Sequence, residues 1–471
     1  MTPSKTSSLK LLSLAASSVI LTACTMGPDY QKPDTTQQTP AQWKWQTAQP
    51  RDNAPRGEWW TVFHDSELNR LQKQALQNNQ DLRGAMARVD QARATLGVSK
   101  IAYFPDASLK ASANRQRTSG NSASPVPLSI PSAMLNSYDV PLTLSYEVDL
   151  WGRIRRNVES VKATADATTA DYHNVLLSLN GDVALNYYLL RSYDTELEAI
   201  NRTVASQENS LGLIRQRFTA GTIPETDLAK AESELATTKA DQADVKRQRE
   251  ETVSVLAVLC GQPASTFDIA VRALDGAPPQ IPAGVPANLL ERRPDVASAE
   301  RKVASTNADI GATIAGYFPA VSLTGQGGFS SKDTASLFQS DSRVWSFGPS
   351  VTLPITGGFV NHAKVERARG ANAEAIAAYR QSVLGAIKDV ETSLTQIHYR
   401  RTQSDALRDA VTHSTKATDL ARQRYESGSV SYLEFLDAQR TSLASERSAA
   451  RVQAQGYIAT VRLIKALGGG W

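Results

Sequence analysis

The sequence predicts a mainly α-helical protein with a small β part, built from two tandem copies of one unit. Apolar residues recur every seven positions over a stretch much longer than an ordinary globular helix. The residues that mark the ends of these helices return roughly 200 residues further along the chain. Each copy also contains two short stretches in which apolar and polar residues alternate, as they do in β-strands.

The heptad pattern is longest between Arg153 and Ile223, where no proline occurs. A helix over these residues would be roughly 100 Å long. We expect it to end near Gly221, which can adopt a left-handed cap, and Pro224 suits the first turn of a return helix that ends near Leu259. The heptad positions hold Leu176, Val183, Leu190, Leu197, Val204, Leu211 and Phe218.

The same hairpin pattern returns near the C-terminus. Tyr425 and Gly428 repeat the positions of Phe218 and Gly221 at one constant offset. The matching residues at the helix ends favour a duplication over two unrelated coiled coils. Further upstream, Tyr103-Phe104-Pro105 matches Tyr317-Phe318-Pro319. The expected order is a signal peptide at 1–23, an extended N-terminal segment and equatorial region at 24–65, a first repeat at 66–261, a Pro-rich equatorial linker at 262–293 and a second repeat at 294–471.

The N-terminus has the pattern of a bacterial lipoprotein signal. Lys5 and Lys10 precede a short apolar run that ends in Leu21-Thr22-Ala23-Cys24. In such signals the cysteine becomes the mature N-terminus and carries acyl chains that anchor it in a membrane. Thr25 then favours the outer membrane. The alternative is an ordinary signal peptide followed by an incidental cysteine.

Four alternating segments are candidate β-strands, two in each repeat. Their apolar and polar sides fit membrane strands, and on periodicity alone they fit a half-buried soluble hairpin equally well. Four strands cannot close a barrel, and an open edge in lipid would leave backbone groups unpaired. Three chains would supply twelve strands, with the helices continuing as an α-helical barrel. The segments are Asp106–Arg117, Tyr138–Val148, Val321–Phe329 and Trp345–Leu353.

Composition and motifs argue against other functional classes. The net charge of +4 is spread along the chain, which is atypical of a nucleic-acid surface. Histidines are scattered without metal-ligand spacing, and neither a Walker loop nor a Gly-x-Ser-x-Gly motif occurs. We therefore expect no enzyme and no cofactor other than lipid on Cys24. Cys260 is expected to be a small buried apolar residue.

Several of these stretches resemble the outer-membrane efflux channels of the TolC superfamily, and most closely their lipoprotein branch, the OprM/NodT-like proteins. The resemblance covers essentially the whole mature chain. It implies a homotrimer with a twelve-stranded barrel in the outer membrane and a long periplasmic helical barrel with an equatorial mixed region. It also implies a periplasmic adaptor (membrane fusion protein) and an inner-membrane RND-type transporter, with toxic compounds such as drugs as cargo. The stretches are Cys24 with its signal, the two Tyr-Phe-Pro turns, Asp149–Gly152, Leu290–Asp295 and Tyr425–Arg440.

The resemblance places the functional residues at the periplasmic tip. It implies that the turns at Gly221 and Gly428 contact the adaptor, although the turns themselves also require glycine. It implies a pore gate at Leu433 and Asp437, where three copies of the aspartate would form an acidic ring. The alternative for Asp437 is a solvated helix face.

The resemblance also implies a tip latch made of Tyr425, Arg440, Asp227 and Thr226. Arg440 and Asp227 could form a charge-assisted hydrogen bond between helices. The sequence departs from the lipoprotein branch at Glu426, where a basic residue is common. Other functions left open are a duct for protein or peptide (type I) secretion, a periplasmic coiled-coil scaffold, and an enzyme with an unrecognised site.

Overall fold

The structure, a computed structural model, describes residues 25–45, 57–119, 132–283, 292–355 and 357–469. The chain folds into two compact units. The first unit holds the described parts of Met1–Pro33, Val89–Thr168 and Ala299–Ala378, and the second holds those of Asp34–Arg88, Thr169–Ser298 and Tyr379–Trp471.

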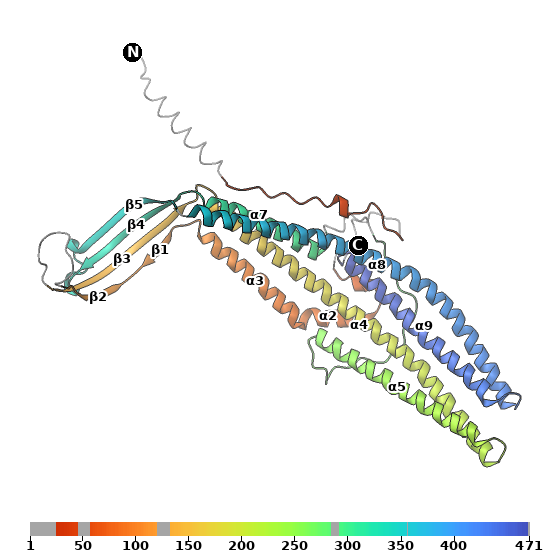
Figure 1. The fold of residues 1–471 in the computed structure, drawn as a ribbon. Helices are drawn as coiled ribbons and strands as arrows, with labels where there is room; N and C mark the ends of the chain where they lie inside the picture. The colour runs from red at the N-terminus through yellow and green to blue at the C-terminus, as the bar shows by residue number, and fades with distance from the viewer. Residues whose placement is uncertain (1–24, 46–56, 120–131, 284–291, 356, 470–471) are drawn as a thin grey trace. The chain divides into compact units, whose positions relative to one another are not determined.

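One antiparallel sheet lies in the first unit (Figure 1), and its edge strand is interrupted. Pro141 has no N–H, so Lys110 donates to the Pro141 carbonyl at 3.1 Å without a reciprocal bond, and the first predicted strand appears as two. The strands are β1 (Asp106–Leu109), β2 (Ser112–Arg117), β3 (Met134–Val148), β4 (Ala320–Ser331) and β5 (Arg343–Thr352), in the order β1-β3-β4-β5 with β2 also paired to β3.

The two faces of the sheet differ in chemistry. Trp345 and Phe347 on β5 lie 83% and 72% exposed on one face. The register places Leu142 and Leu144 of β3 and Leu109 of β1 on this same face, and they are exposed too. The opposite face carries mainly serine, threonine and charged side chains. A soluble hairpin would bury such an apolar face, so the arrangement favours strands that face lipid.

Seven α-helices are assigned among the described residues. The predicted single helix from Ser66 is two helices, because Asn79 leaves the helical conformation with φ −62° and ψ 127°. The Asn79 side chain then accepts from the Leu82 N–H at 2.9 Å. The helices are α2 (Ser66–Asn78), α3 (Gln80–Ile101), α4 (Arg153–Thr219), α5 (Glu225–Leu259), α7 (Pro294–Ala315), α8 (Gly357–Glu426) and α9 (Tyr432–Ala466). Within this part of the chain, no helix has both the length and the apolar composition of a membrane span.

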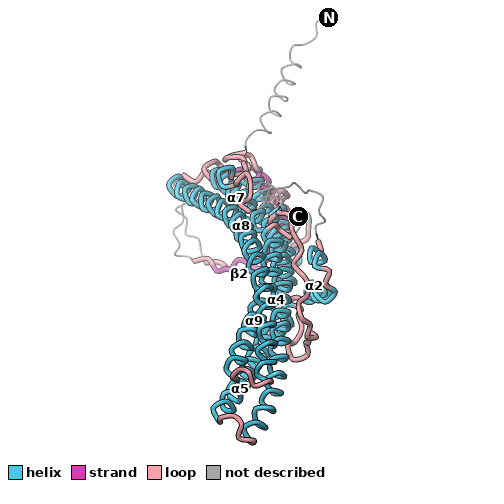
Figure 2. Tube along the Cα trace, turned by 90° about the vertical axis from the view of Figure 1, so that its right-hand side faces the viewer, coloured by secondary structure: helices cyan, strands magenta, loops and turns pink. Residues whose placement is uncertain are grey.

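The duplication predicted from the sequence is confirmed at the two tip turns (Figure 2). Gly221 and Gly428 both adopt positive φ, 69° and 77°. Each turn has the same Schellman pattern of hydrogen bonds: the Thr222 N–H donates to the Arg217 carbonyl at 2.9 Å, and Ser429 to Arg424 at 2.8 Å. The two hairpins, α4/α5 and α8/α9, are therefore equivalent down to the backbone.

The far end of each return helix is also equivalent in the two repeats. The C-terminal carbonyl of α5, on Leu259, accepts from the Asn79 side chain at 3.0 Å, and that of α9, on Ala466, accepts from Arg293 at 3.1 Å. In both repeats the return helix is followed by a glycine that has a positive φ. At Gly261 this angle is 66°. A Cβ there would lie 2.4 Å from the Asn78 carbonyl oxygen. Each return helix thus docks against the helix that opens its own repeat.

The lower parts of both hairpins share one hydrophobic core in the second unit. Residues from all four helices contribute, so α4/α5 and α8/α9 pack on each other and not only within each hairpin. The buried residues are Leu197, Ile200, Val204, Leu211, Ile214, Ala231, Leu235, Val245, Ala421, Tyr425, Tyr432, Phe435 and Leu436.

Gly261→Ala should destabilise the protein more than Gly221→Ala. Both positions have positive φ, which costs alanine about 1–2 kcal/mol, but open space surrounds Gly221 whereas the Asn78 carbonyl crowds Gly261. Thermal unfolding of the detergent-solubilised protein would compare the two variants. Equal losses of stability would mean that the close approach at Gly261 is unimportant.

Candidate functional site

The predicted gate residues lie on one exposed face of α9. Ser431 caps the helix by accepting from the Glu434 N–H at 3.4 Å, which sets where the helical register begins. Leu433 is 46% exposed, and Asp437, one turn further, is exposed on the same face. The face presents a leucine beside a carboxylate to solvent, away from the shared core.

The predicted latch has a different partner within this chain. Arg440 donates to Glu234 of α5 through Nε at 2.9 Å and through a second guanidinium nitrogen. It forms this bond instead of the expected one with Asp227, which lies half-buried in the first turn of α5 next to the exposed Thr226. Glu234 is nearly buried and one heptad deeper along α5, so it offers a better desolvated acceptor.

Tyr425 lies in the aromatic centre of the shared core. Its ring stacks on Phe435 at 6.0 Å and lies 5.5 Å from Tyr432. Burial raises the pKa of Tyr425 and raises the pKa of Tyr432 to about 12, so both remain neutral at physiological pH. Arg217 of α4 lies 5.3 Å from the Tyr425 ring and donates to the Glu426 carbonyl at 3.0 Å. Tyr425 therefore holds the two tips together through packing.

The turns at Gly221 and Gly428 are exposed, and a Cβ at either glycine would meet no other group. Their positive φ accounts for glycine at both positions. Because none of the described residues covers them, the turns remain available as a contact surface.

A buried charge cluster joins the hairpins above the tips. Glu196 of α4 is fully buried and accepts from Arg447 at 2.6 Å and from Arg451 at 2.7 Å, both on α9. Arg447 also donates to Asp241 of α5 at 2.7 Å. Removing one partner of a buried pair costs about 3–5 kcal/mol, against about 0.2–1 kcal/mol for an exposed pair. Only the spacing of these residues could have indicated the cluster, because charged residues on long helices usually face solvent.

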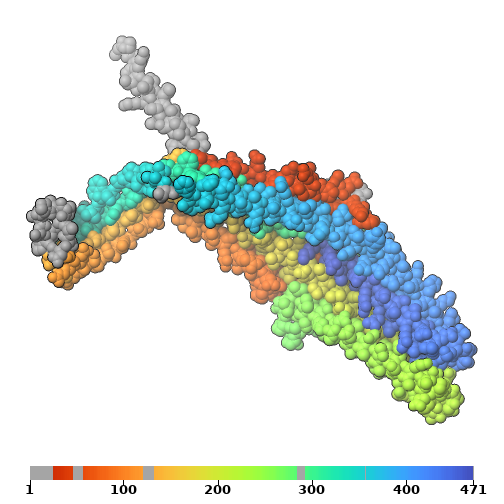
Figure 3. Space-filling model, in the orientation of Figure 1, coloured from red at the N-terminus to blue at the C-terminus, as the bar shows by residue number. Residues whose placement is uncertain are grey.

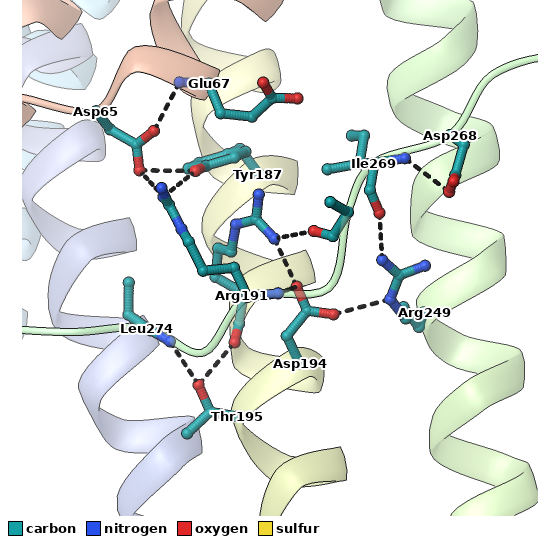
Figure 4. Close-up of polar contacts among 12 residues, drawn as sticks. Asp65, Glu67, Tyr187, Arg191, Asp194, Thr195, Arg249, Asp268, Ile269 and Leu274 are labelled. Atoms are coloured by element: carbon teal, nitrogen blue, oxygen red, sulfur yellow. Dashed lines mark hydrogen bonds and ion pairs between the residues drawn. The ribbon is translucent and has the colours of Figure 1, made fainter.

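A second buried cluster fixes the linker onto α4 and α5 (Figure 4). Asp194, at 0% side-chain exposure, accepts from Arg191 at 2.6 Å and from Arg249 at 2.8 Å. It also accepts from the Arg272 backbone N–H at 3.1 Å. Burial opposes ionisation of Arg249, but its bonds to Asp194 prevail and its pKa is raised. The carboxylate is therefore the fixed point for two helices and the linker.

The linker continues from this cluster to the second hairpin. Arg191 donates to the Ala270 carbonyl at 2.8 Å, and the Leu274 N–H donates to the Thr195 hydroxyl at 2.8 Å. On α9, Tyr457 donates to the Asp275 carbonyl at 2.9 Å. The segment is thus bound to α4, α5 and α9 and ties the two hairpins together.

In the first unit, the described residues just after Cys24, drawn in red in Figure 3, contact α7: Asn307 of α7 donates to the Pro28 carbonyl at 3.0 Å. Met26 donates its N–H to the Trp151 carbonyl at 3.1 Å, at the junction of β3 and α4. Gly27 packs so closely on Gly311 of α7 that a Cβ on Gly27 would lie 2.4 Å from the Gly311 Cα. Cys24 itself lies outside the described residues. The residues next to it are held at the base of the sheet.

The described residues bring together no group of three or more His, Cys, Asp or Glu side chains that could hold a metal ion. Cys260 is buried, and burial raises the pKa of its thiol to about 11. A groove of about 1040 Å³ is lined by Trp45, the linker, α8 and α9. Its lining includes the basic side chains of Arg400, Arg401 and Arg408.

Asp194→Asn should free the linker. The variant leaves Arg191 and Arg249 without their buried counter-charge, at a cost of about 3 kcal/mol or more. Limited proteolysis of the folded protein should then cleave between residues 262 and 283 several-fold faster than in the wild type. Asp268→Asn is the matched control, because this exposed aspartate accepts only from the adjacent Ile269 N–H. Equal cleavage of both variants would contradict the role of Asp194.

Comparison with known proteins gives matches over nearly the whole chain. The family model described as "Outer membrane efflux protein" matches residues 71–262 and 285–469. The outer membrane protein OprJ of Pseudomonas aeruginosa is 35% identical over 465 residues, covering 96% of this chain and 94% of that protein. The solvent efflux pump outer membrane protein SrpC of Pseudomonas putida is 34% identical, covering 96% and 97%.

Solved structures agree with these matches. The outer-membrane channel OprN has a TM-score of 0.86 and 33% identity, with coverage of 95% of this chain and 100% of that chain. The MtrE outer membrane channel of Neisseria gonorrhoeae, described in its open state, has a TM-score of 0.81 and 29% identity, with coverage of 94% and 98%.

Proposed function

Because the chain belongs to the outer membrane efflux protein family, we propose that three copies form the exit duct of a tripartite efflux system. The single observation that carries the proposal is the two-faced sheet attached to the two long helical hairpins. The sheet suits an outer membrane, and the hairpins suit the wall of a periplasmic duct. The protein acts as a conduit and not as an enzyme.

The trimer is supported by the edges of the sheet. In the described chain, β5 on one side and β1 with β2 on the other have no second neighbour. Unpaired backbone groups in lipid cost several kcal/mol each. Edge-to-edge pairing between chains removes this cost, and three chains give twelve strands when β1 and β2 count as one.

The cargo proposed is small toxic compounds such as drugs and solvents, delivered by an inner-membrane RND-type pump through a periplasmic adaptor. SrpC is named for solvent efflux, and OprN and MtrE are named as outer-membrane channels. The exposed tip turns offer the surface where an adaptor would dock. Neither turn carries a cluster of one charge. An adaptor that binds the tips would therefore have to match the shape of the Schellman turns.

Deleting the gene should raise sensitivity to a panel of antibiotics and organic solvents, and the plasmid-borne gene should restore resistance. Minimum inhibitory concentrations would be measured in parallel with the amounts of periplasmic and extracellular proteins. Together they would distinguish efflux of small compounds from protein secretion. Unchanged sensitivity together with loss of a secreted protein would favour type I secretion instead.

We also propose that Cys24 carries the N-terminal lipid. The support is the signal pattern before it and the position of Met26 at the base of the sheet, where an acyl chain on Cys24 would reach the membrane. Mass spectrometry of the mature protein should find an acylated Cys24 at its N-terminus. In Cys24→Ser, sorting to the outer membrane should fall while the helical fold is retained. A mature N-terminus at any other residue would exclude the lipoprotein assignment.

Leu433 and Asp437 form the proposed pore gate, with Arg440 as part of the latch beside it. Their shared exposed face supports this assignment, because three symmetry copies would give an apolar ring next to an acidic one. Asp437→Asn keeps the shape and removes the charge. Single-channel recording in planar bilayers should show several-fold lower cation preference and weaker block by divalent cations. If both are unchanged, Asp437 does not face the pore.

A further inference from the structure

The contacts between the two hairpins become more buried with distance from the tips. At the tips, Arg217 donates to the Glu426 carbonyl and lies over the Tyr425 ring, and Glu426 is exposed. The pair of Arg440 and Glu234, here called the lower pair, follows with Arg440 55% exposed. The cluster of Glu196, Arg447, Arg451 and Asp241, here called the upper cluster, is centred on a fully buried carboxylate.

Heptad spacing places the lower pair and the upper cluster in line. Asp241 follows Glu234 by seven residues on α5, and Arg447 follows Arg440 by seven on α9. Two turns of helix separate them, so the same faces of α5 and α9 meet at both levels. The two sets of contacts are therefore successive links along one interface. The lower carboxylate, Glu234, is 10% exposed and binds one arginine, whereas the upper one, Glu196, is 0% exposed and binds two.

The interface below the upper cluster contains a weakness. Gln207 of α4 is buried in this region, and its side-chain carbonyl oxygen makes no hydrogen bond among the described residues. A buried hydrogen-bond acceptor without a partner destabilises the packed state. When the helices separate, water can donate a hydrogen bond to it. Nearby, Gln439 of α9 reaches Ser206 at 3.2 Å as a single neutral bond. Between the lower pair and the upper cluster, separation of the hairpins is therefore opposed by apolar packing, by this bond and by the exposed pair of Arg202 and Glu446.

The interface above the upper cluster is tied more strongly. Tyr188 of α4 stacks on Tyr457 of α9 with ring centroids 4.6 Å apart. Tyr457 and Gln453 both donate to the linker, to the Asp275 carbonyl and to the Gly276 carbonyl. Because the linker is fixed on Asp194, this level of α9 is bound to α4 both directly and through the linker.

We propose that the upper cluster is a stop that sets how far the two hairpins of one chain part when the duct opens. This inference rests on the proposed function of the protein as a gated channel. Opening begins with separation of the tips, which breaks the lower pair and exposes the Gln207 side chain to water. The separation stops at the bonds of Glu196. Glu196, Arg447 and Arg451 are positioning residues: they fix the pivot of the gate and do not line it.

If the lower pair and the upper cluster break one after the other, the effect of a variant in the upper cluster should depend on whether the lower pair is intact. Glu234→Gln should raise the open fraction of single channels several-fold and leave the largest conductance unchanged. Glu196→Gln alone should change the resting open fraction little, since the lower pair still holds. The double variant should show a conductance level larger than any level of either single variant. Arg451→Gln, which leaves the Glu196–Arg447 bond, should replace Glu196→Gln if the latter does not fold, and should give a smaller increase in the double variant.

Single-cysteine labelling gives an independent readout of where the hairpins part. Gln439→Cys lies below the upper cluster, Ala454→Cys lies above it, and both positions are buried. Cys260 contributes little background, because its raised pKa leaves roughly one thiolate in a thousand at pH 8. In the Glu234→Gln background a maleimide should label Gln439→Cys several-fold faster and leave Ala454→Cys protected. Adding Glu196→Gln should expose Ala454→Cys.

Arg202→Gln is the matched control. Arg202 also bridges α4 to α9, through Glu446 at 2.7 Å, but is 59% exposed and should leave the conductance levels and labelling unchanged. The stop is refuted if the double variant has no larger conductance than Glu234→Gln, or if Ala454→Cys becomes reactive while Glu196 is intact. If the wild-type protein forms no channel in bilayers, the proposed function fails, and that result differs from either of these.

Discussion

A carboxylate removed from water must be paired, and the Asp194 carboxylate meets this requirement by binding three separate segments at once. Arg191 and Arg249 bring charge from α4 and α5, and the Arg272 backbone adds the linker. Since the linker also reaches α9, this buried negative charge connects the first hairpin to the second through the linker, in addition to their direct contacts. A hydrophobic contact would define this connection less sharply, because it would tolerate sliding of one helix along another.

Much of the architecture could be predicted from the sequence, because the spacing of apolar residues and the residues that end a helix are local signals. The heptads and the glycines indicated the two hairpins to within a few residues, and alternation indicated the strands. The break at Asn79 was not predicted. Asn79 caps the second helix through the Leu82 N–H, which is a local signal, and its other bond, to the Leu259 carbonyl, is with a residue distant in the sequence.

The site was predicted less completely for the same reason. Leu433 and Asp437 lie together on α9, as helical spacing requires, and Tyr425 lies at the tip. Within the described chain Arg440 bonds to Glu234, and the bond to Asp227 stays a prediction, because the choice between them depends on how deeply the helices overlap. The clusters around Glu196 and Asp194 were missed: their members read as ordinary solvated charges until the helices are placed side by side.

The duplicated unit has not stayed symmetrical where it meets its own first helix. Asn79 and Arg293 perform the same bond to the end of a return helix, but only Arg293 carries charge, and it also pairs with Asp295 and Asp389. The first repeat is joined at this point by a neutral amide and the second by an ion-pair network. Salt should therefore weaken this joint in the second repeat more than the corresponding joint in the first.

The crowded backbone at Gly27 and Gly311 has a consequence for engineering this protein. A Cβ on Gly27 would lie 2.4 Å from the Gly311 Cα, and one on Gly311 would lie 2.6 Å from the Met26 carbonyl oxygen, so the path of these residues across α7 requires glycine at both positions. An affinity tag inserted between Cys24 and Asp29 would displace this path and uncouple the anchor from the sheet. The exposed turn between β4 and β5 has no such restriction and is the better place for a label.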